Sequence, residues 1–73
     1  MKYVLAGSWL EYRRFVEKQE ENGYTEISQV EHLNRIKAGG TLIVTGNYQK
    51  RAIWPEIKAV AKAREIIIEE QII

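Results

Sequence analysis

The chain has 73 residues, of which 45% are hydrophobic and 29% are charged, a composition typical of one small folded domain (residues 1–73) and not of a disordered segment. Its 11 lysines and arginines nearly balance 10 glutamates, so the net charge of +1 gives no general attraction to nucleic acid or to anionic membranes. The lack of cysteine and aspartate excludes disulfides, thiolate metal sites, thiol nucleophiles and aspartate-based triads or phosphoacceptors.

The hydropathy pattern predicts where the protein is found. No apolar run reaches the roughly 18 residues that a membrane span needs, and the N-terminal run is too short for a signal peptide. We therefore expect a complete protein in the cytoplasm, with no membrane partner.

The N-terminal third predicts a strand followed by a helix. Residues 3–6 form a short apolar run, which is typical of a strand buried on both faces. The pattern Ser8-x-x-Glu11 is that of a capping box and predicts a helix over residues 9–19. Asn22-Gly23 provides the stop, because glycine readily adopts the left-handed conformation found after a helix.

The middle of the chain predicts a second, shorter unit of the same kind. Residues 24–27 have the composition of a weak strand, and Ser28-x-x-Glu31 repeats the capping-box pattern. A short helix is expected to follow and to end at residues 38–40, which contain two glycines.

The C-terminal part predicts a third unit and a closing strand. Residues 41–45 are largely β-branched and end at the turn Gly46-Asn47. Pro55 suits the first turn of a third helix, where its missing N–H costs nothing. Residues 66–70 have a strand composition, and the last residues, Ile72-Ile73, form a tail to which the pattern assigns no structure.

The order β-α-β-α-β-α-β predicts an α/β fold of the flavodoxin or Rossmann type, with a four-stranded parallel sheet and three helices. The strand order 2-1-3-4 places the two most apolar strands in the middle. One helix then covers one face of the sheet and two cover the other. We expect the less covered face to expose apolar surface and to favour a homodimer.

Ligands of parallel sheets bind beyond the carboxyl ends of the strands, where neighbouring connections go to opposite faces. In the order 2-1-3-4 this crevice lies between the turn after the first strand and the loop after the third. The candidate ligand-binding or partner-binding residues there are Gly7, Ser8, Trp9, Tyr12, Gly46, Asn47, Tyr48, Lys50 and Arg51.

Two interpretations of this crevice remain open. In one, Ser8 and the free N–H groups of the first helix hold a nucleotide or another phosphate ligand, Tyr48 or Trp9 stacks on a base, and Lys50 or Arg51 neutralises charge. In the other, the glycines only permit turns and Ser8 only caps the helix. The dinucleotide and P-loop glycine patterns are missing, so no cofactor is predicted.

Other residues that carry chemistry lack suitable partners. His32 has no partner at a metal-binding or catalytic spacing and is predicted to be solvated. Glu69 and Glu70 point to opposite faces of a strand and cannot act together. No catalytic residue and no metal ligand is therefore assigned.

A nucleic-acid site is the remaining electrostatic possibility. Arg13-Arg14 and Lys50-Arg51 are the only basic pairs that have aromatic neighbours in the sequence. Interspersed glutamates would repel a phosphate backbone, so an ordinary surface of mixed charge explains these pairs better.

Trp54 and Arg51 have structural interpretations. Trp54 precedes Pro55 and is expected to pack on the third helix or under the Tyr48 loop. Arg51 is expected to stack on a ring or to bond carbonyl groups of its own loop.

The motif Gly46-x-Tyr48-x-x-Arg51-x-x-Trp54-Pro55-Glu56-Ile57 resembles small phage-encoded α/β proteins, in which a glycine-aromatic-arginine loop precedes a Trp-x-Glu-Ile helix start. Residues 3–8, followed by Tyr12 and Phe15, look similar to the first strand and helix of these proteins. The chain differs from their pattern at Ala52 and Ile53. The resemblance implies a phage origin and a fold, and it implies no activity.

The function expected from these observations is that of a phage accessory or host-takeover protein in the bacterial cytoplasm. It would be a non-enzymatic interaction module that binds a host protein through Tyr48, Lys50 and Arg51, flanked by Trp9 and Tyr12, because aromatic residues and arginine are the usual anchors of interfaces. Binding of a nucleotide or phosphate in the crevice is the alternative.

Overall fold

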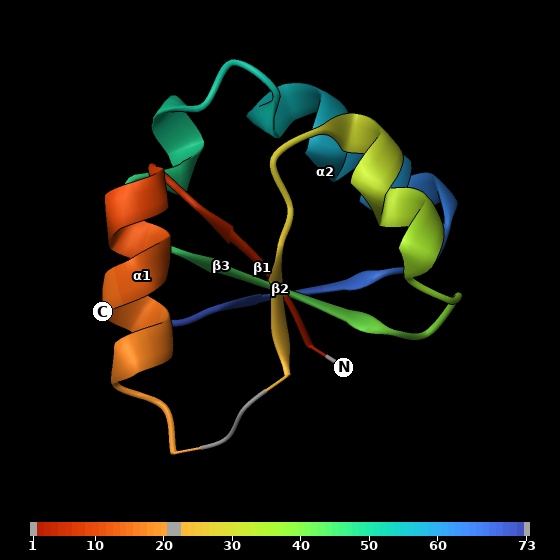
Figure 1. Cartoon of the computed structure of the whole chain (residues 1–73). Helices are drawn as coiled ribbons and strands as arrows, with labels where there is room; N and C mark the ends of the chain where they lie inside the picture. Colours follow the sequence, from red (N-terminus) through yellow and green to blue (C-terminus); the bar gives the residue numbers. More distant parts are fainter. Residues whose placement is uncertain (1, 21–22, 73) are drawn as a thin grey trace.

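Four parallel strands form the centre of the structure, and their order, β2-β1-β3-β4, is the predicted one (Figure 1). This computed structural model describes residues 2–20 and 23–72. The strands are β1 (Lys2–Ala6), β2 (Tyr24–Glu26), β3 (Thr41–Thr45) and β4 (Ile67–Glu70). The central pair aligns Val4 with Ile43 and Leu5 with Val44. These four side chains are buried, as expected for strands covered on both faces.

The helices cover the two faces unequally, as predicted. Figure 1 shows α1 (Trp9–Glu17) on one side of the strands, and α2 (Trp54–Ala63) on the other side. The α1 face has a small core around Phe15, whereas the opposite face has the larger core, which includes Ile57 of α2. Among the described residues, no helix is long and apolar enough to cross a membrane.

The N-terminus of α1 follows the prediction, whereas its C-terminus does not. Ser8 is the N-cap, and its hydroxyl accepts a hydrogen bond from the Glu11 N–H at 3.2 Å. The helix ends at Glu17, earlier than expected, where the Gln19 side chain donates to the Phe15 carbonyl at 3.2 Å and satisfies a terminal acceptor. The predicted stop at Asn22 lies outside the described residues, and Gly23 has a φ of 95°.

The second predicted helix is a 3₁₀ helix, η1 (Val30–Arg35), and not an α-helix. Its N-cap is Gln29 and makes no side-chain capping bond, so the expected cap at Ser28 is wrong. The residues of this segment that pack in the core, Val30, Leu33 and Ile36, are spaced three apart. This spacing matches the three residues per turn of a 3₁₀ helix.

The predicted third helix is confirmed as α2, with Pro55 in its first turn. At its other end the Arg64 guanidinium donates to the Leu33 carbonyl at 2.6 Å and to the Ile36 carbonyl at 3.1 Å. These bonds join the C-terminal end of α2 to η1 on the same face of the sheet.

The chain leaves α2 through an unusual residue. Glu65 has a φ of 58°, a left-handed conformation that glycine normally supplies after a helix. The next N–H, that of Ile66, donates to the Ala61 carbonyl at 2.8 Å, and the chain then enters β4.

Candidate functional site

The predicted crevice lies where the loop after β3 meets the start of α1. The two segments approach so closely that a Cβ atom at Gly7 would lie 2.7 Å from the Asn47 carbonyl carbon and would also collide with the Glu11 carboxylate. Gly46 has a φ of 63°, and a Cβ atom there would lie 2.6 Å from Glu11 Cδ. Close contact therefore requires glycine at both positions, and the positive φ also favours glycine at Gly46, whether or not the crevice binds a ligand.

Glu11 itself fills this crevice. Its carboxylate accepts a hydrogen bond from the Asn47 backbone N–H at 3.0 Å and another from the Asn47 side-chain amide at 3.3 Å. An anionic ligand at this switch point would need the same kind of backbone donor. The protein thus supplies its own carboxylate at the position of the predicted phosphate, and Ser8 acts as the helix cap.

The remaining hollow at this edge is also acidic. It has a volume of about 320 Å³, and both Glu11 and Glu70 contribute to its walls, together with Gly46, Asn47, Gln71 and Ile72. Two carboxylates in so small a space repel a phosphate group. The geometry therefore does not favour the phosphate-ligand interpretation.

Tyr48 lies inside the loop rather than at its surface. Its side chain is only 7% exposed, and its hydroxyl donates to Glu70 Oε2 at 2.7 Å. The hydrogen bond to Glu70, followed by burial, raises the pKa of Tyr48 above its ordinary value. The expectation that a partner would meet the Tyr48 ring is therefore wrong, because the ring is used to connect the loop to β4.

The Tyr48 ring also packs edge-on against Trp54, with the ring centroids 4.8 Å apart. This contact confirms that Trp54 packs under the loop as predicted. Arg51 bonds a carbonyl group, but in a different segment from the one expected: its Nη1 donates to the Ala6 carbonyl of β1 at 3.0 Å. The loop after β3 is thus bonded to β1, α1 and β4.

Trp9 is the most prominent aromatic residue at this edge of the sheet. Its side chain is 57% exposed, although it stacks on Tyr12 with the ring centroids 5.3 Å apart. The Arg13 guanidinium lies 5.9 Å from the centroid of the Trp9 ring. Trp9 is therefore both accessible and held in place, whereas Tyr12 is buried beneath it.

Tyr12 has a structural role. Its hydroxyl donates to the Tyr24 carbonyl at 3.2 Å and so connects α1 to β2. Burial, with a smaller contribution from Glu26, raises the pKa of Tyr12. Of the nine predicted residues, five are exposed: Ser8, Trp9, Gly46, Asn47 and Lys50. Ser8 and Asn47 bond within the protein and Gly46 has no side chain, which leaves Trp9 and Lys50 for contact with a partner.

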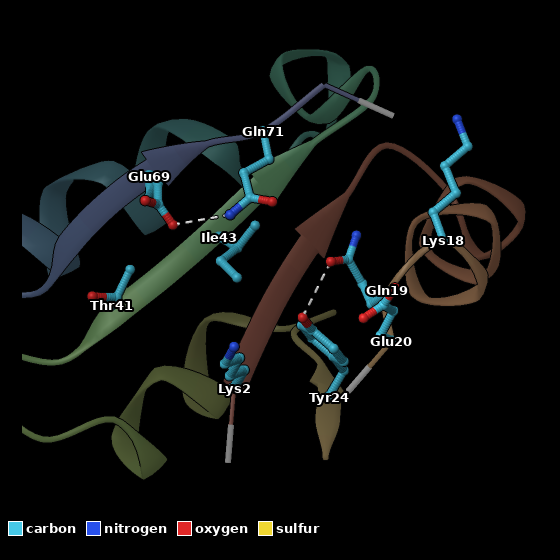
Figure 2. Close-up of a pocket in the computed structure, with 9 residues that line it drawn as sticks. All are labelled: Lys2, Lys18, Gln19, Glu20, Tyr24, Thr41, Ile43, Glu69 and Gln71. Atoms are coloured by element: carbon cyan, nitrogen blue, oxygen red, sulfur yellow. Dashed lines mark hydrogen bonds between the residues drawn. The ribbon is translucent and has the colours of Figure 1, made fainter. Parts of the chain in front are cut away.

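A larger groove of about 680 Å³ lies on the α1 face of the sheet (Figure 2). Sequence analysis predicted exposed apolar surface on this face, but the side chains here are mainly polar, and Ile43 on the floor is 6% exposed. The polar and charged residues that line it include Lys2, Lys18, Glu20, Thr41, Glu69 and Gln71. On this face the expected apolar exposure is found at Ile67 of the edge strand.

His32 is not solvated as predicted. It is partly buried, and its Nδ1 accepts a hydrogen bond from the Ser28 backbone N–H at 3.2 Å. No group of three or more His, Cys, Asp or Glu residues able to hold a metal ion occurs within residues 2–20 and 23–72.

One residue of each basic pair has a partner within the protein. Arg13 forms an ion pair with Glu17 at 3.6 Å, one helical turn away, and the Arg51 guanidinium donates to the Ala6 carbonyl. The ion pair offsets part of the Arg13 charge, and the bond to Ala6 occupies a donor of Arg51 that a nucleic-acid backbone would need.

Sequence reasoning missed the role of Glu11. The capping-box pattern assigned its side chain to the N-terminus of α1. Its position three residues after the cap, next to the carboxyl ends of β1 and β3, was the available signal. Glu70 was missed as well, because its partner Tyr48 is 22 residues away.

We compared the chain with protein-family models, with curated protein sequences and with solved structures, and none of the three comparisons found a match.

Proposed function

We propose that this protein is a non-enzymatic interaction module that binds another protein through the carboxyl edge of its sheet. The binding surface comprises Trp9 and Leu10 at the start of α1, and the exposed part of the loop after β3 around Lys50. The observation that carries the proposal is Trp9, which is 57% exposed and is nevertheless held by Tyr12 and Arg13.

Such a residue is a suitable anchor. Tryptophan contributes more than most residues to the energetic centres of interfaces. Because stacking already restricts the Trp9 ring, it loses little conformational freedom on binding. Leu10, which is also largely exposed, adds apolar area beside it.

The loop after β3 supports the same surface. Its bonds to Glu11, Glu70 and Ala6 hold it in one conformation, so that Lys50 is presented from a rigid support. The glutamates at this edge bond loop residues, and His32 bonds the backbone N–H of Ser28. These side chains are used to build the fold, which fits a binding role better than a catalytic one.

The proposed class of partner is based on the resemblance of residues 46–57 to phage-encoded proteins. We propose a protein of the bacterial host, which a phage accessory protein would bind in the cytoplasm. The test is affinity capture from a bacterial lysate with wild type, Trp9→Ala and Lys50→Ala, followed by titration of the purified partner.

Lys62→Ala on α2 is the control, because Lys62 is exposed and lies on a different element. Trp9→Ala should weaken binding of the purified partner at least about thirtyfold, the effect of losing roughly 2 kcal/mol at an interface anchor. Lys62→Ala should leave it unchanged. Equal affinity for wild type and Trp9→Ala, with both proteins folded by circular dichroism, would refute the proposal.

A further inference from the structure

The edge strand β4 concentrates apolar surface that the fold leaves uncovered. Five large hydrophobic side chains within the described ranges are exposed, and three of them lie on or just after β4. Ile67 is 57% exposed, Ile68 is 37% exposed and Ile72 is 94% exposed. This surface is separate from Trp9 and has no part in the function proposed above.

One backbone edge of β4 has no neighbouring strand in the sheet of the described residues. Its inner edge bonds β3: the Ile67 N–H donates to the Gly40 carbonyl and the Gln71 N–H to the Val44 carbonyl. In a parallel ladder the N–H and C=O groups of alternate residues point the same way. Ile68 and Glu70 therefore direct both groups away from β3, at the open edge of the sheet.

The usual protections of an edge strand are weak here. Natural proteins block such edges with lysine, proline, bulges or covering segments. β4 contains neither lysine nor proline, and within residues 2–20 and 23–72 no strand lies beyond β4 in the order β2-β1-β3-β4. Its two glutamates are the charged groups that decide how another strand can approach.

We infer that β4 is the interface of a homodimer, in which β4 of a second copy adds in antiparallel orientation and the two sheets become one. A second copy offers the same outward donors and acceptors, so a two-fold axis pairs the two edges with each other. In the antiparallel pair, the residues whose backbone groups point outward, Ile68 and Glu70, must form the hydrogen-bonded pairs. The two-fold axis can then pass through Ile68, Glu69 or Glu70, and each of these centres defines one register.

Charge selects among these three registers. In the register centred on Glu69, the two Glu69 carboxylates lie opposite each other. In the register centred on Glu70, the two Glu70 carboxylates lie opposite each other. Like charges directly opposite each other are destabilising. A centre at Ile68 instead packs Ile68 on Ile68 of the second copy. It also places Ile67 opposite Glu69 of the second copy, so the carboxylates are kept apart.

The position of Ile67 and Glu69 supports this pairing. Both lie on the α1 face of the sheet, since Ile67 is in register with Thr41 and Glu69 with Ile43. Figure 2 shows Thr41, Ile43 and Glu69 together on this face. Across the two-fold axis, the aliphatic part of the Glu69 side chain would cover Ile67, and the carboxylate would remain in solvent.

Two lysine substitutions test the register. Ile68→Lys places two lysines opposite each other and should raise the dimer dissociation constant at least about tenfold, whereas Ile67→Lys places lysine opposite Glu69 of the second copy and should lower it. The measurement is sedimentation equilibrium from about 10 μM to about 1 mM, the range expected for an interface below the standard size.

Hydrogen exchange of the wild-type protein gives a readout that needs no variant. The amides of Ile68 and Glu70 should become more protected as concentration rises, while those of Ile67 and Gln71, bonded to β3, should not change. A monomer throughout the concentration range would overturn the inference. An equal increase of the dimer dissociation constant in Ile67→Lys and Ile68→Lys would overturn it too. Capture of an extended peptide by β4 with no self-association would overturn it as well.

Discussion

The Glu11 carboxylate on α1 accepts two hydrogen bonds from Asn47, one from the backbone N–H at 3.0 Å and one from the side-chain amide at 3.3 Å. These bonds join the first helix to the loop after β3 across the switch point of the sheet. Glu11→Ala should lower the free energy of unfolding by about 1–2 kcal/mol, because the Asn47 donors lose their acceptor.

Thermal unfolding measures this loss, since each kcal/mol shifts the midpoint by roughly 4–8 °C in a domain of this size. Glu17→Ala on the same helix is the control. It removes only an exposed ion pair with Arg13 and should cost less than about 0.5 kcal/mol. Equal destabilisation by both substitutions would show that Glu11 contributes only to the stability of α1 and that its bonds to Asn47 add nothing.

The acidic crevice leads to a prediction about ligands. Nucleoside mono-, di- and triphosphates and inorganic phosphate should not raise the thermal midpoint, because Glu11 and Glu70 line the hollow beside the loop. A phosphate ligand at 100 times its dissociation constant would add about 2.7 kcal/mol of stability. A midpoint rise of that size with any member of this panel would restore the phosphate-site interpretation.

Alanine substitutions at Gly46 and Gly39 can be compared directly. Both have positive φ, 63° and 85°, but a Cβ atom at Gly46 meets Glu11 whereas one at Gly39 meets nothing within 4 Å. Gly39→Ala should cost about 1 kcal/mol through backbone strain alone. Gly46→Ala should cost about 1–2 kcal/mol more, because Glu11 must leave Asn47.

A double-mutant cycle checks this explanation. In the Glu11→Ala background, Gly46→Ala should cost no more than Gly39→Ala does, as measured by urea unfolding. An undiminished extra cost at Gly46 would show that something other than Glu11 restricts this position.

The bond from Tyr48 to Glu70 predicts a loss of stability at alkaline pH. The folded state raises the pKa of Tyr48, since its neutral hydroxyl donates to Glu70. The resulting stabilisation is complete below the unfolded value of about 10 and is lost as pH rises through the folded pKa. Stability should therefore fall above about pH 10, and Tyr48→Phe should make this fall shallower.

At neutral pH, Tyr48→Phe should cost about 1–2 kcal/mol, because it removes a hydrogen bond to a carboxylate. Tyr24→Phe is the control: the Tyr24 hydroxyl makes a longer bond, 3.5 Å, to Gln19. Urea unfolding at pH 7 and pH 11 measures both effects. Identical pH profiles for wild type and Tyr48→Phe would contradict the assignment.

Glu65 offers a stabilising substitution. It has a φ of 58° directly after α2, where a side chain is strained and glycine is not. Glu65→Gly should raise the free energy of unfolding by about 0.5–1 kcal/mol, while Ala59→Gly inside the helix should lower it by a similar amount. Chemical unfolding of the two variants should show opposite signs, and a loss at both positions would refute the explanation.

Most of the fold could be predicted from local patterns. The capping residue Ser8, the β-branched run in β3 and Pro55 in the first turn of α2 each mark an element through its own residues. The strand order followed because the most apolar strands need burial on both faces. The 3₁₀ form of η1 was missed, because apolar residues spaced three apart, Val30, Leu33 and Ile36, occur in both helix types.

The candidate site was predicted in position but not in detail. The Gly46 turn lies at the switch point as expected, but Tyr48 is buried and Arg51 bonds a different strand. Aromatic and charged residues in a loop suggest a surface, and only their partners decide whether they are exposed. Those partners, Glu70 and Ala6, are 22 and 45 residues away in the chain.

The sequence by itself determined the strands, the two α-helices, their parallel arrangement and the edge at which loops gather, because apolar runs and helix caps are formed by residues close in the chain. Only the tertiary structure decided that Glu11 fills the crevice, that Trp9 is the accessible aromatic residue and that isoleucines line the open edge of β4. These features depend on which side chains meet across the sheet, and that is set by packing between segments distant in the chain.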